Sequence, residues 1–303
     1  MITGLKACVE QIAAESGAHM GVAIHHIETG QEVMLNADEL FALASVVKVP
    51  VLVEAFRQIE ENRLRLTDRW TLVQEVKALG SGILTELDNG LPLTVQDLLV
   101  LMIIISDNTA TDMLMQRLGI DNIDRNLHAL GFENIHTAHT LTEIFTDMLP
   151  SADPNQDRSK LAAWEAEHGV NKDGWAYRMG PENNVGSPRD LTCLMTKIYK
   201  GEIISRSACD QMLAILLRQH LNDRIPRFLP LGTKVAHKTG TFSGVRNDSG
   251  IIYVNDNSHV AVTILSRWDH DAVRKDPVKD WERSIQIDSA MGKIALAAYE
   301  AFS

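Results

Sequence analysis

The chain has 303 residues, of which 45% are hydrophobic and 23% are charged, a composition typical of a soluble globular protein with one large core or two interleaved domains. Its formal net charge of −11 argues against nucleic acid or an anionic membrane as the main partner, because both bind basic surfaces. The cysteines are odd in number and far apart, which favours reduced thiols over a disulfide framework: Cys8, Cys193 and Cys209.

The first twenty residues contain charged and polar side chains where a signal peptide has a continuous apolar run of about 7 to 15 residues. We therefore expect a cytoplasmic protein, or a periplasmic or secreted one if an export signal precedes this sequence. No stretch approaches the roughly 18 apolar residues of a membrane span, so we expect no membrane partner.

The predicted elements alternate between strand-rich ends and a helical middle. An amphipathic helix over residues 3–14 precedes two short strands around the turn signal Glu28-Thr29-Gly30. From about residue 45 to residue 199 the pattern is mostly helical, with helix starts marked by Thr94 and by Ser187-Pro188. Another helix is predicted over residues 205–219.

Strands resume at residue 234, with a hairpin turn at Asn255-Asp256, and a last helix covers residues 281–302. Strands at both ends predict an α+β fold, with an antiparallel sheet flanked by helices and built from both termini, and an inserted all-α domain. The predicted sheet domain comprises residues 1–42 and 203–303. The predicted helical domain comprises residues 43–202 and contains a long loop insertion near 150–184.

The stretch "FALASVVKVPVLVEAF", residues 41–56, is apolar with a helical period except at Ser45 and Lys48. These residues are three apart, so both side chains lie on one face of a helix that starts near Ser45. Burying an unpaired ammonium group costs several kcal/mol, roughly. That cost is explained if Ser45 is a nucleophile and Lys48 is the base that it needs.

Two further motifs follow in order, Ser106-Asp107-Asn108 and Lys238-Thr239-Gly240 with Thr241 after it. Each alone occurs by chance, but the set in this order is specific. Here the chain resembles the penicillin-recognising serine hydrolases, the superfamily of class A β-lactamases and penicillin-binding proteins. The likeness covers essentially the whole chain and is particularly close to class A around "LTVQDLLVLMIIISDNTATDML".

The resemblance implies a β-lactamase/transpeptidase-like fold and a role for each motif residue. Ser45 is the expected nucleophile, Lys48 its base and Ser106 a proton shuttle, while Asn108 orients Lys48 and the substrate amide. Backbone N–H groups of Ser45 and Thr241 are expected to bind the oxyanion. The expected substrate-binding residues are Asn108, Lys238, Thr239, Thr241 and Arg246, of which all but Asn108 are assigned to a substrate carboxylate.

The sequence departs from class A at the glutamate that activates the deacylating water. The expected Glu-Pro-Glu-Leu-Asn-like run is absent, and counting forward from Ser106 leads to "HTLTEIFTDML", where Glu143 and Asp147 take the family's positions. Glu143 is the predicted catalytic carboxylate, although it could equally face solvent on a helix. Glu165, Glu167 and Glu182 are weaker candidates, and Lys48 could serve both half-reactions.

No metal or other cofactor is expected. His136 and His139 are three residues apart, but no cysteine or carboxylate set completes a zinc site in the sequence. The leading interpretation is a serine acyl-enzyme hydrolase that cleaves a β-lactam or a related small-molecule amide. The alternatives are a cytoplasmic amidase, peptidase or esterase on the same scaffold, and a slow-turnover penicillin-binding sensor.

Overall fold

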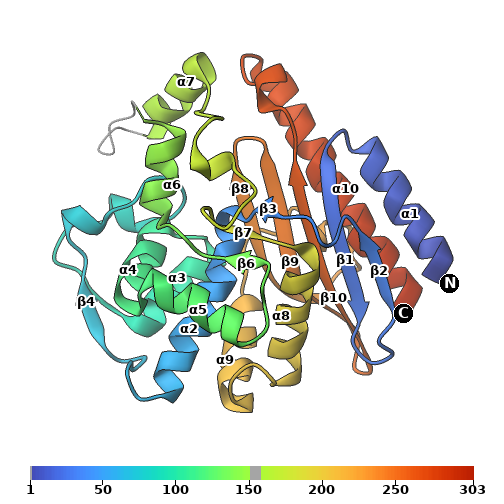
Figure 1. Ribbon diagram of the computed structural model, residues 1–303, viewed down its shortest axis with the longest axis horizontal. Helices are drawn as coiled ribbons and strands as arrows, with labels where there is room; N and C mark the ends of the chain where they lie inside the picture. Colours follow the sequence, from blue (N-terminus) through green and yellow to red (C-terminus); the bar gives the residue numbers. More distant parts are fainter. Residues whose placement is uncertain (1, 151–157) are drawn as a thin grey trace.

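The computed structural model describes residues 2–150 and 158–303, with the backbone alone at 158–162. Strands from both ends of the chain form one antiparallel five-stranded sheet in the order β2-β1-β10-β9-β8 (Figure 1). Its members are β1 (His19–His26), β2 (Glu32–Leu35), β8 (Lys234–Phe242), β9 (Val245–Asn255) and β10 (Ser258–Arg267). The predicted α+β class is therefore confirmed, and so is the turn after Asn255.

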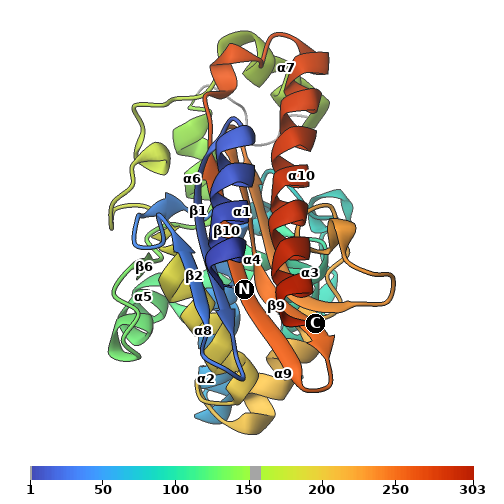
Figure 2. The same cartoon turned by 90° about the vertical axis from the view of Figure 1, so that its right-hand side faces the viewer.

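Helices cover both faces of this sheet, which explains why β10 is buried along nearly its whole length. The terminal helices α1 (Ile2–Glu15) and α10 (Pro277–Phe302) lie side by side on one face (Figure 2). Helix α8 (Pro188–Lys200) packs on the other face. Helix α10 begins four residues before its predicted start, because the carboxylate of Asp276 accepts hydrogen bonds from the backbone N–H groups of Val278 and Lys279.

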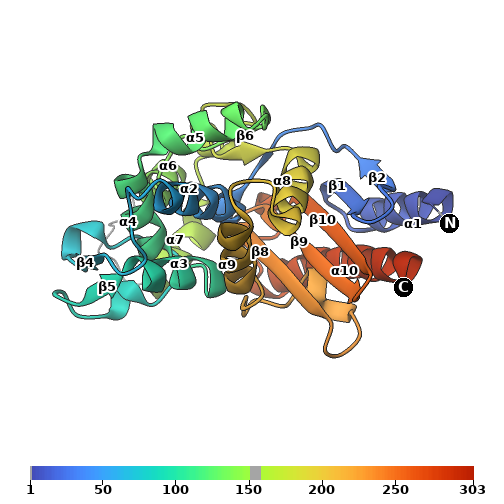
Figure 3. The same ribbon diagram turned by 90° about the horizontal axis from the view of Figure 1, so that it is seen from below.

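The helical part of the chain surrounds α2, which runs through its centre (Figure 3). Its helices are α2 (Lys48–Glu60), α3 (Val95–Ile104), α4 (Asn108–Leu118), α5 (Ile120–Ala129), α6 (Leu141–Met148) and α9 (Arg206–Leu216). The predicted caps are confirmed at Thr94 and Ser187, whose side chains each accept a backbone N–H of the first turn. Ser205 caps α9 in the same way. The helical core joins the sheet through α8 and α9. The domain boundaries at 42/43 and 202/203 stay a prediction.

Two small sheets complete the fold. Strands β3 (Phe41–Ala42), β7 (Val185–Gly186) and β6 (Ile135–His136) pair in the order β3-β7-β6, and β4 (Arg69–Thr71) pairs with β5 (Pro92–Thr94). Short 3₁₀ turns lie at Ala44–Val47, Gln74–Val76, Leu84–Glu86, Trp175–Tyr177, Ile225–Phe228 and His270–Ala272. The β3-β7-β6 sheet matters most here, because β3 leads directly into Ser45.

The region predicted as a long loop contains a helix, α7 (Arg158–His168). Its sequence has no distinct apolar face, so the residue pattern does not predict a helix there. Trp164 and Trp175 belong to an apolar cluster with Ile144 and Met148 of α6, so this region folds onto the body of the protein. Residues 151–157 of the predicted insertion lie outside the described residues. In the part of the chain that the structure describes, no helix combines the length and hydropathy needed to cross a bilayer.

Candidate active site

Ser45 sits in a 3₁₀ turn, Ala44–Val47, between β3 and α2, so the α-helix itself begins three residues later than its predicted start. Ala44 has a positive φ of 47°, an unusual conformation for a residue with a Cβ. Ser45 is only 8% exposed and lines a cavity of about 280 Å³. The turn therefore presents this serine to a small, partly open cavity at the N-terminus of a helix.

Lys48 is fully buried, and its Nζ atom contacts three oxygens of the second motif. Nζ lies 2.7 Å from the backbone oxygen of Ser106, 2.9 Å from its Oγ and 2.8 Å from Oδ1 of Asn108. The structure thus brings the first and second motifs into direct contact.

Lys238 of the third motif also contacts Ser106. Its Nζ donates to Oγ of Ser106 at 3.1 Å and to the backbone oxygen of Thr239 at 2.7 Å. The Ser106 hydroxyl consequently bridges the two buried lysines, and the three predicted motifs form one hydrogen-bonded cluster.

Burial lowers the pKa of Lys48 to about 7, although the carboxylates of Asp107 and Asp112 oppose the shift. Burial also lowers the pKa of Lys238 well below its ordinary value, and the neighbouring Lys48 lowers it further. Two like charges sharing one hydroxyl repel each other, so protonation of one lysine disfavours protonation of the other. A neutral Lys48 is accordingly accessible near pH 7.

Asp107, the middle residue of the second motif, uses its side chain to accept hydrogen bonds from backbone N–H groups. Its carboxylate accepts hydrogen bonds from the N–H groups of Ile83, Leu84 and Ala110, which ties the 80–84 loop to the start of α4. Gly82 lies so close that a Cβ there would stand 2.3 Å from the Asp107 carboxyl carbon. This packing explains the glycine and holds Ser81 of the same loop in the cavity wall.

Strand β8 runs beside the Ser45 turn and supplies the third motif. A Cβ on Gly240 would lie 2.5 Å from the backbone oxygen of Leu43 and 3.2 Å from the nitrogen of Ser45. Only glycine permits this close approach. The backbone of residue 45 therefore lies next to the last residues of β8, as an oxyanion site shared by Ser45 and Thr241 requires.

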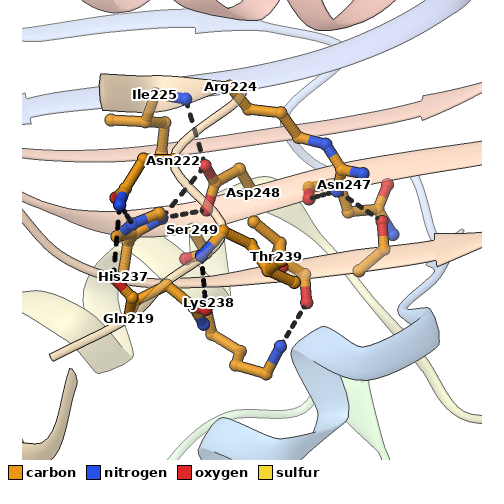
Figure 4. Close-up of polar contacts among 12 residues, drawn as sticks. Gln219, Asn222, Arg224, Ile225, His237, Lys238, Thr239, Asn247, Asp248 and Ser249 are labelled. Atoms are coloured by element: carbon orange, nitrogen blue, oxygen red, sulfur yellow. Dashed lines mark hydrogen bonds and ion pairs between the residues drawn. The ribbon is translucent and has the colours of Figure 1, made fainter. Parts of the chain in front are cut away.

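His237, the neighbour of Lys238 on β8, belongs to a second buried network (Figure 4). Nδ1 of His237 lies 2.9 Å from Oδ1 of Asp248, and its Nε2 lies 3.3 Å from Oδ1 of Asn222. The Asp248 carboxylate also accepts the backbone N–H of Ile225. This network fixes β8 and β9 and thereby positions Lys238 and Thr239.

Arg224 is a site residue that the sequence analysis missed, because a single arginine in the loop before β8 gives no motif. Its guanidinium is buried and donates to the backbone oxygens of Gly240 (2.8 Å) and Asn247 (2.6 Å) and to the hydroxyl of Thr241. Figure 4 shows this side chain reaching along the sheet towards Asn247. A fixed positive charge thus stands directly behind the third motif.

The structure does not place Arg246 in the cavity that Ser45 lines. Nη1 of Arg246 lies 3.7 Å from the Asp288 carboxylate, in a separate hollow on the far side of Thr241. Arg224 binds that same carboxylate at 2.9 Å. Arg224 donates to the Thr241 hydroxyl, and the carboxylate-binding role of Arg246 stays a prediction.

The cavity has a polar side formed by the motifs and an apolar wall formed by α6. The polar lining includes Ser45, Ser106, Asn108, Thr239, Thr241, Asn183 and Asn184. The apolar wall comprises Leu141, Ile144, Phe145 and Met148. Among the described residues, the lining includes no carboxylate.

The structure does not bring Glu143 into this group. Its carboxylate accepts the backbone N–H (2.8 Å) and the hydroxyl (2.9 Å) of Thr140, and its side chain is 54% exposed. Helix α6 places Leu141 in the cavity wall instead, because Asp112 accepts the N–H groups of Leu141 and Thr142 and so fixes the helix start. This placement gives the predicted role of Glu143 no support.

The weaker candidates also lie outside the cavity lining. Glu165 contacts the hydroxyl of Ser243 and lines the hollow that contains Arg246. Glu167 and Glu182 are exposed. Among the described residues, no carboxylate therefore lines the cavity shared with Ser45.

The family model described as the beta-lactamase enzyme family matches residues 4–302, nearly the whole chain. The chain belongs to the β-lactamase enzyme family. The predicted superfamily is thereby confirmed. Membership supports hydrolysis of the amide bond of small β-lactam molecules.

Individual relatives agree with this assignment. A β-lactamase of Rhodobacter capsulatus is 30% identical over 295 residues, which cover 94% of this chain and 88% of that protein. The crystal structure of a β-lactamase from Sphaerobacter thermophilus has a TM-score of 0.76 at 28% identity and covers 99% of this chain and 97% of its own. An acyl-enzyme complex of a PBP-A mutant with penicillin-G has a TM-score of 0.75 at 25% identity, covering 99% and 96%.

Proposed function

We propose that this protein opens β-lactams by forming an acyl-enzyme on Ser45, and that it releases the acyl group slowly. The observation that carries the proposal is the contrast between the two sides of the cavity. Polar residues of all three motifs line the cavity with Ser45, whereas the α6 residues that line it are apolar. The described lining therefore supplies polar groups for acylation but no carboxylate base for deacylation.

In acylation, the Oγ atom of Ser45 attacks the lactam carbonyl carbon while a base accepts its proton. Lys48 is the proposed base, since it lies one turn along the chain and its pKa is lowered to about 7. The negative charge that develops on the carbonyl oxygen is stabilised by the backbone N–H groups of Ser45 and Thr241. One such donor contributes roughly 2.7 to 4 kcal/mol in other enzymes.

The leaving nitrogen of the lactam needs a proton, and Ser106 is the proposed carrier. Its hydroxyl lies 2.9 Å from Nζ of Lys48 and 3.1 Å from Nζ of Lys238. A proton taken from Ser45 by Lys48 can therefore pass through Ser106 to the ring nitrogen as the C–N bond breaks. Lys238 keeps the Ser106 hydroxyl oriented between the two ends of this path.

A carboxylate on the substrate would bind at the end of β8. Thr239 and Thr241 line the cavity, and the guanidinium of Arg224 donates to the Thr241 hydroxyl from behind. With Lys238 these groups form a positively charged, hydrogen-bonding corner. This corner favours acyl compounds with an anionic group close to the scissile amide.

Deacylation requires a water activated near the ester carbonyl, and a carboxylate is an effective base for it. Leu141 lines the cavity shared with Ser45 and is 4% exposed, and no described carboxylate lines that cavity. Lys48 is left as the base for both half-reactions. We therefore expect the acyl-enzyme to accumulate.

The test is a burst experiment with a chromogenic cephalosporin, run beside p-nitrophenyl esters and anilides, with intact mass recorded at each time. The proposal predicts a burst of one equivalent with the cephalosporin, then slow turnover, and a mass increase equal to one acyl group. Rapid turnover of esters or anilides without reaction of the cephalosporin would identify an amidase or esterase instead.

Acylation should depend on pH with the titration of Lys48. Only the neutral amine accepts a proton, so the acylation rate should rise about tenfold per pH unit below the pKa and level off above about 7. Stopped-flow acylation by a penicillin between pH 5 and 8.5 measures this profile. A flat profile would contradict the role of Lys48.

Glu143→Gln should leave both half-reactions close to the parental rates, because the Glu143 carboxylate is occupied at the start of α6. Glutamine can still accept the Thr140 N–H in the capping box, so the unfolding midpoint should change little. Single-turnover deacylation and thermal unfolding measure the two effects. A fall in deacylation of about 10² with unchanged acylation would instead restore Glu143 as the water-activating base.

A further inference from the structure

Three metal-ligating side chains that are separate in the sequence converge at the junction of α5 and β6. Asp124 and His128 lie one helical turn apart on α5, and His136 comes from β6. Nδ1 of His128 and Nδ1 of His136 each lie 3.6 Å from the Asp124 carboxylate. The potential ligand atoms of all three residues lie within 4.8 Å of one another.

Two polar atoms at this junction are buried without a hydrogen-bond partner among the described residues, namely Nε2 of His128 and Oγ1 of Thr137. Thr137 is only 2% exposed, and it lines the same hollow as Asp124 and His128. Unsatisfied buried polar atoms are costly, so native proteins usually pair them with water or an ion. Because Thr137 lines this hollow, its unpaired hydroxyl indicates a missing polar occupant there, whereas Nε2 of His128 lies on a different edge of its ring from the Nδ1 atom that faces Asp124.

The Asp124 carboxylate is already held in place. Its Oδ1 accepts the backbone N–H of Thr137 at 3.1 Å, which leaves Oδ2 directed at His128. Hydrogen bonds of this kind orient metal-binding carboxylates in known sites. The two imidazole rings meet edge to face with centroids 4.9 Å apart, and each places its Nδ1 beside the Asp124 carboxylate.

Two imidazoles and one carboxylate suit a transition-metal ion better than calcium or magnesium, which prefer oxygen ligands. In a tetrahedral zinc site with bonds of about 2.0 to 2.1 Å, neighbouring ligand atoms are about 3.3 Å apart. The two histidine nitrogens lie 3.6 Å from different oxygens of Asp124, and all potential ligand atoms lie within 4.8 Å of one another, so side-chain rotations are needed to bring three ligand atoms to that spacing. The adjoining hollow leaves room for water as a fourth ligand.

We propose that Asp124, His128 and His136 bind one divalent transition-metal ion of the Zn²⁺ type, with a structural role. The site lies outside the cavity of Ser45, but a short chain of contacts joins the two. The residues after His136 donate backbone N–H groups to Oδ1 of Asn184, Ala138 at 2.8 Å and His139 at 3.0 Å. Asn184 lines the cavity, so the ion would stiffen one rim of the active site.

The test uses chelator-treated, full-length protein titrated with Zn²⁺ alone. We expect equilibrium dialysis to find one tightly held Zn²⁺ per chain. The unfolding midpoint should rise by about 3 to 5 °C when Zn²⁺ exceeds its Kd about 100-fold. Co²⁺ in place of Zn²⁺ should give absorption bands of a nitrogen-ligated tetrahedral or five-coordinate ion.

The variants His128→Ala and Asp124→Asn should each weaken Zn²⁺ binding at least about tenfold and abolish the thermal shift. Asp124→Asn keeps the shape of the side chain, so it separates loss of a ligand from misfolding. His168→Ala removes an exposed histidine elsewhere and should bind Zn²⁺ like the parent. No uptake of Zn²⁺ by the parent, or equal uptake in all variants, would overturn the proposal.

Discussion

Lys48→Arg should slow acylation of Ser45 by about 10² or more, the range expected when a general base is lost. Arginine keeps the positive charge at this buried position but has no accessible neutral form. The parental lysine has one, because burial lowers its pKa to about 7. The rise of acylation with pH should disappear in the variant, which a merely structural defect would not cause.

Lys238→Ala is the matched comparison, since it removes the other lysine that contacts Ser106. We expect it to raise KM for substrates with a carboxylate and to have a smaller effect on those without one. Stopped-flow kinetics measure the acylation rate of both variants, and thermal unfolding measures their stability, so a catalytic defect is distinguished from misfolding. Equal acylation rates in Lys48→Arg and the parent would contradict the proposed base.

Leu141→Glu should accelerate deacylation by about 10² or more and convert a stalled acyl-enzyme into a turnover intermediate. The side chain of Leu141 lines the cavity shared with Ser45, and its backbone is fixed by the 2.7 Å hydrogen bond from its N–H group to Asp112. A carboxylate introduced there stands at the first position of α6, where the helix N-terminus favours negative charge. Acylation should change little.

Leu141→Gln provides the control, because glutamine matches glutamate in size but is not a base. We expect it to release the acyl group at the parental rate. The deacylation rate of the parent and of both variants is measured from the decay of the penicilloyl adduct, followed by intact mass after free penicillin is removed. Equal decay in the glutamate and glutamine variants would show that this wall does not face the deacylating water.

The three motifs could be predicted from the sequence because each combines unusual residue types at short spacing, and the fold brings them together as expected. Lys48 could be singled out because a lysine in an apolar helix requires a buried partner. The order of strands and helices followed from periodicity and capping signals, as at Thr94 and Ser187. Location in the cytoplasm stays a prediction.

Glu143 was selected by counting residues, although the sequence held a contrary signal. Thr140 and Glu143 form the Thr-x-x-Glu pattern of a capping box, which commits the carboxylate to the helix start. Leu141 then takes the wall position because Asp112 anchors the turn from another helix. That anchoring depends on tertiary packing, which spacing along the chain does not reveal.

Arg224 and the Asp124–His128–His136 cluster could not be predicted for a similar reason. Arg224 acts through backbone oxygens of strands that follow it in the chain. Asp124 and His128 have the helical spacing of a ligand pair, but their third partner is on a strand beyond the helix. Such groups become visible only when the elements are placed in space.

The central claim is that Ser45 is the acylated nucleophile, and peptide mapping of the penicillin adduct tests it most directly. Protein incubated with penicillin, quenched in acid and digested should carry one penicilloyl group on the peptide that contains Ser45. Ser45→Ala should carry none while it retains the parental unfolding midpoint. An adduct on Ser81, Ser106 or a cysteine, or an unchanged adduct in Ser45→Ala, would contradict the account.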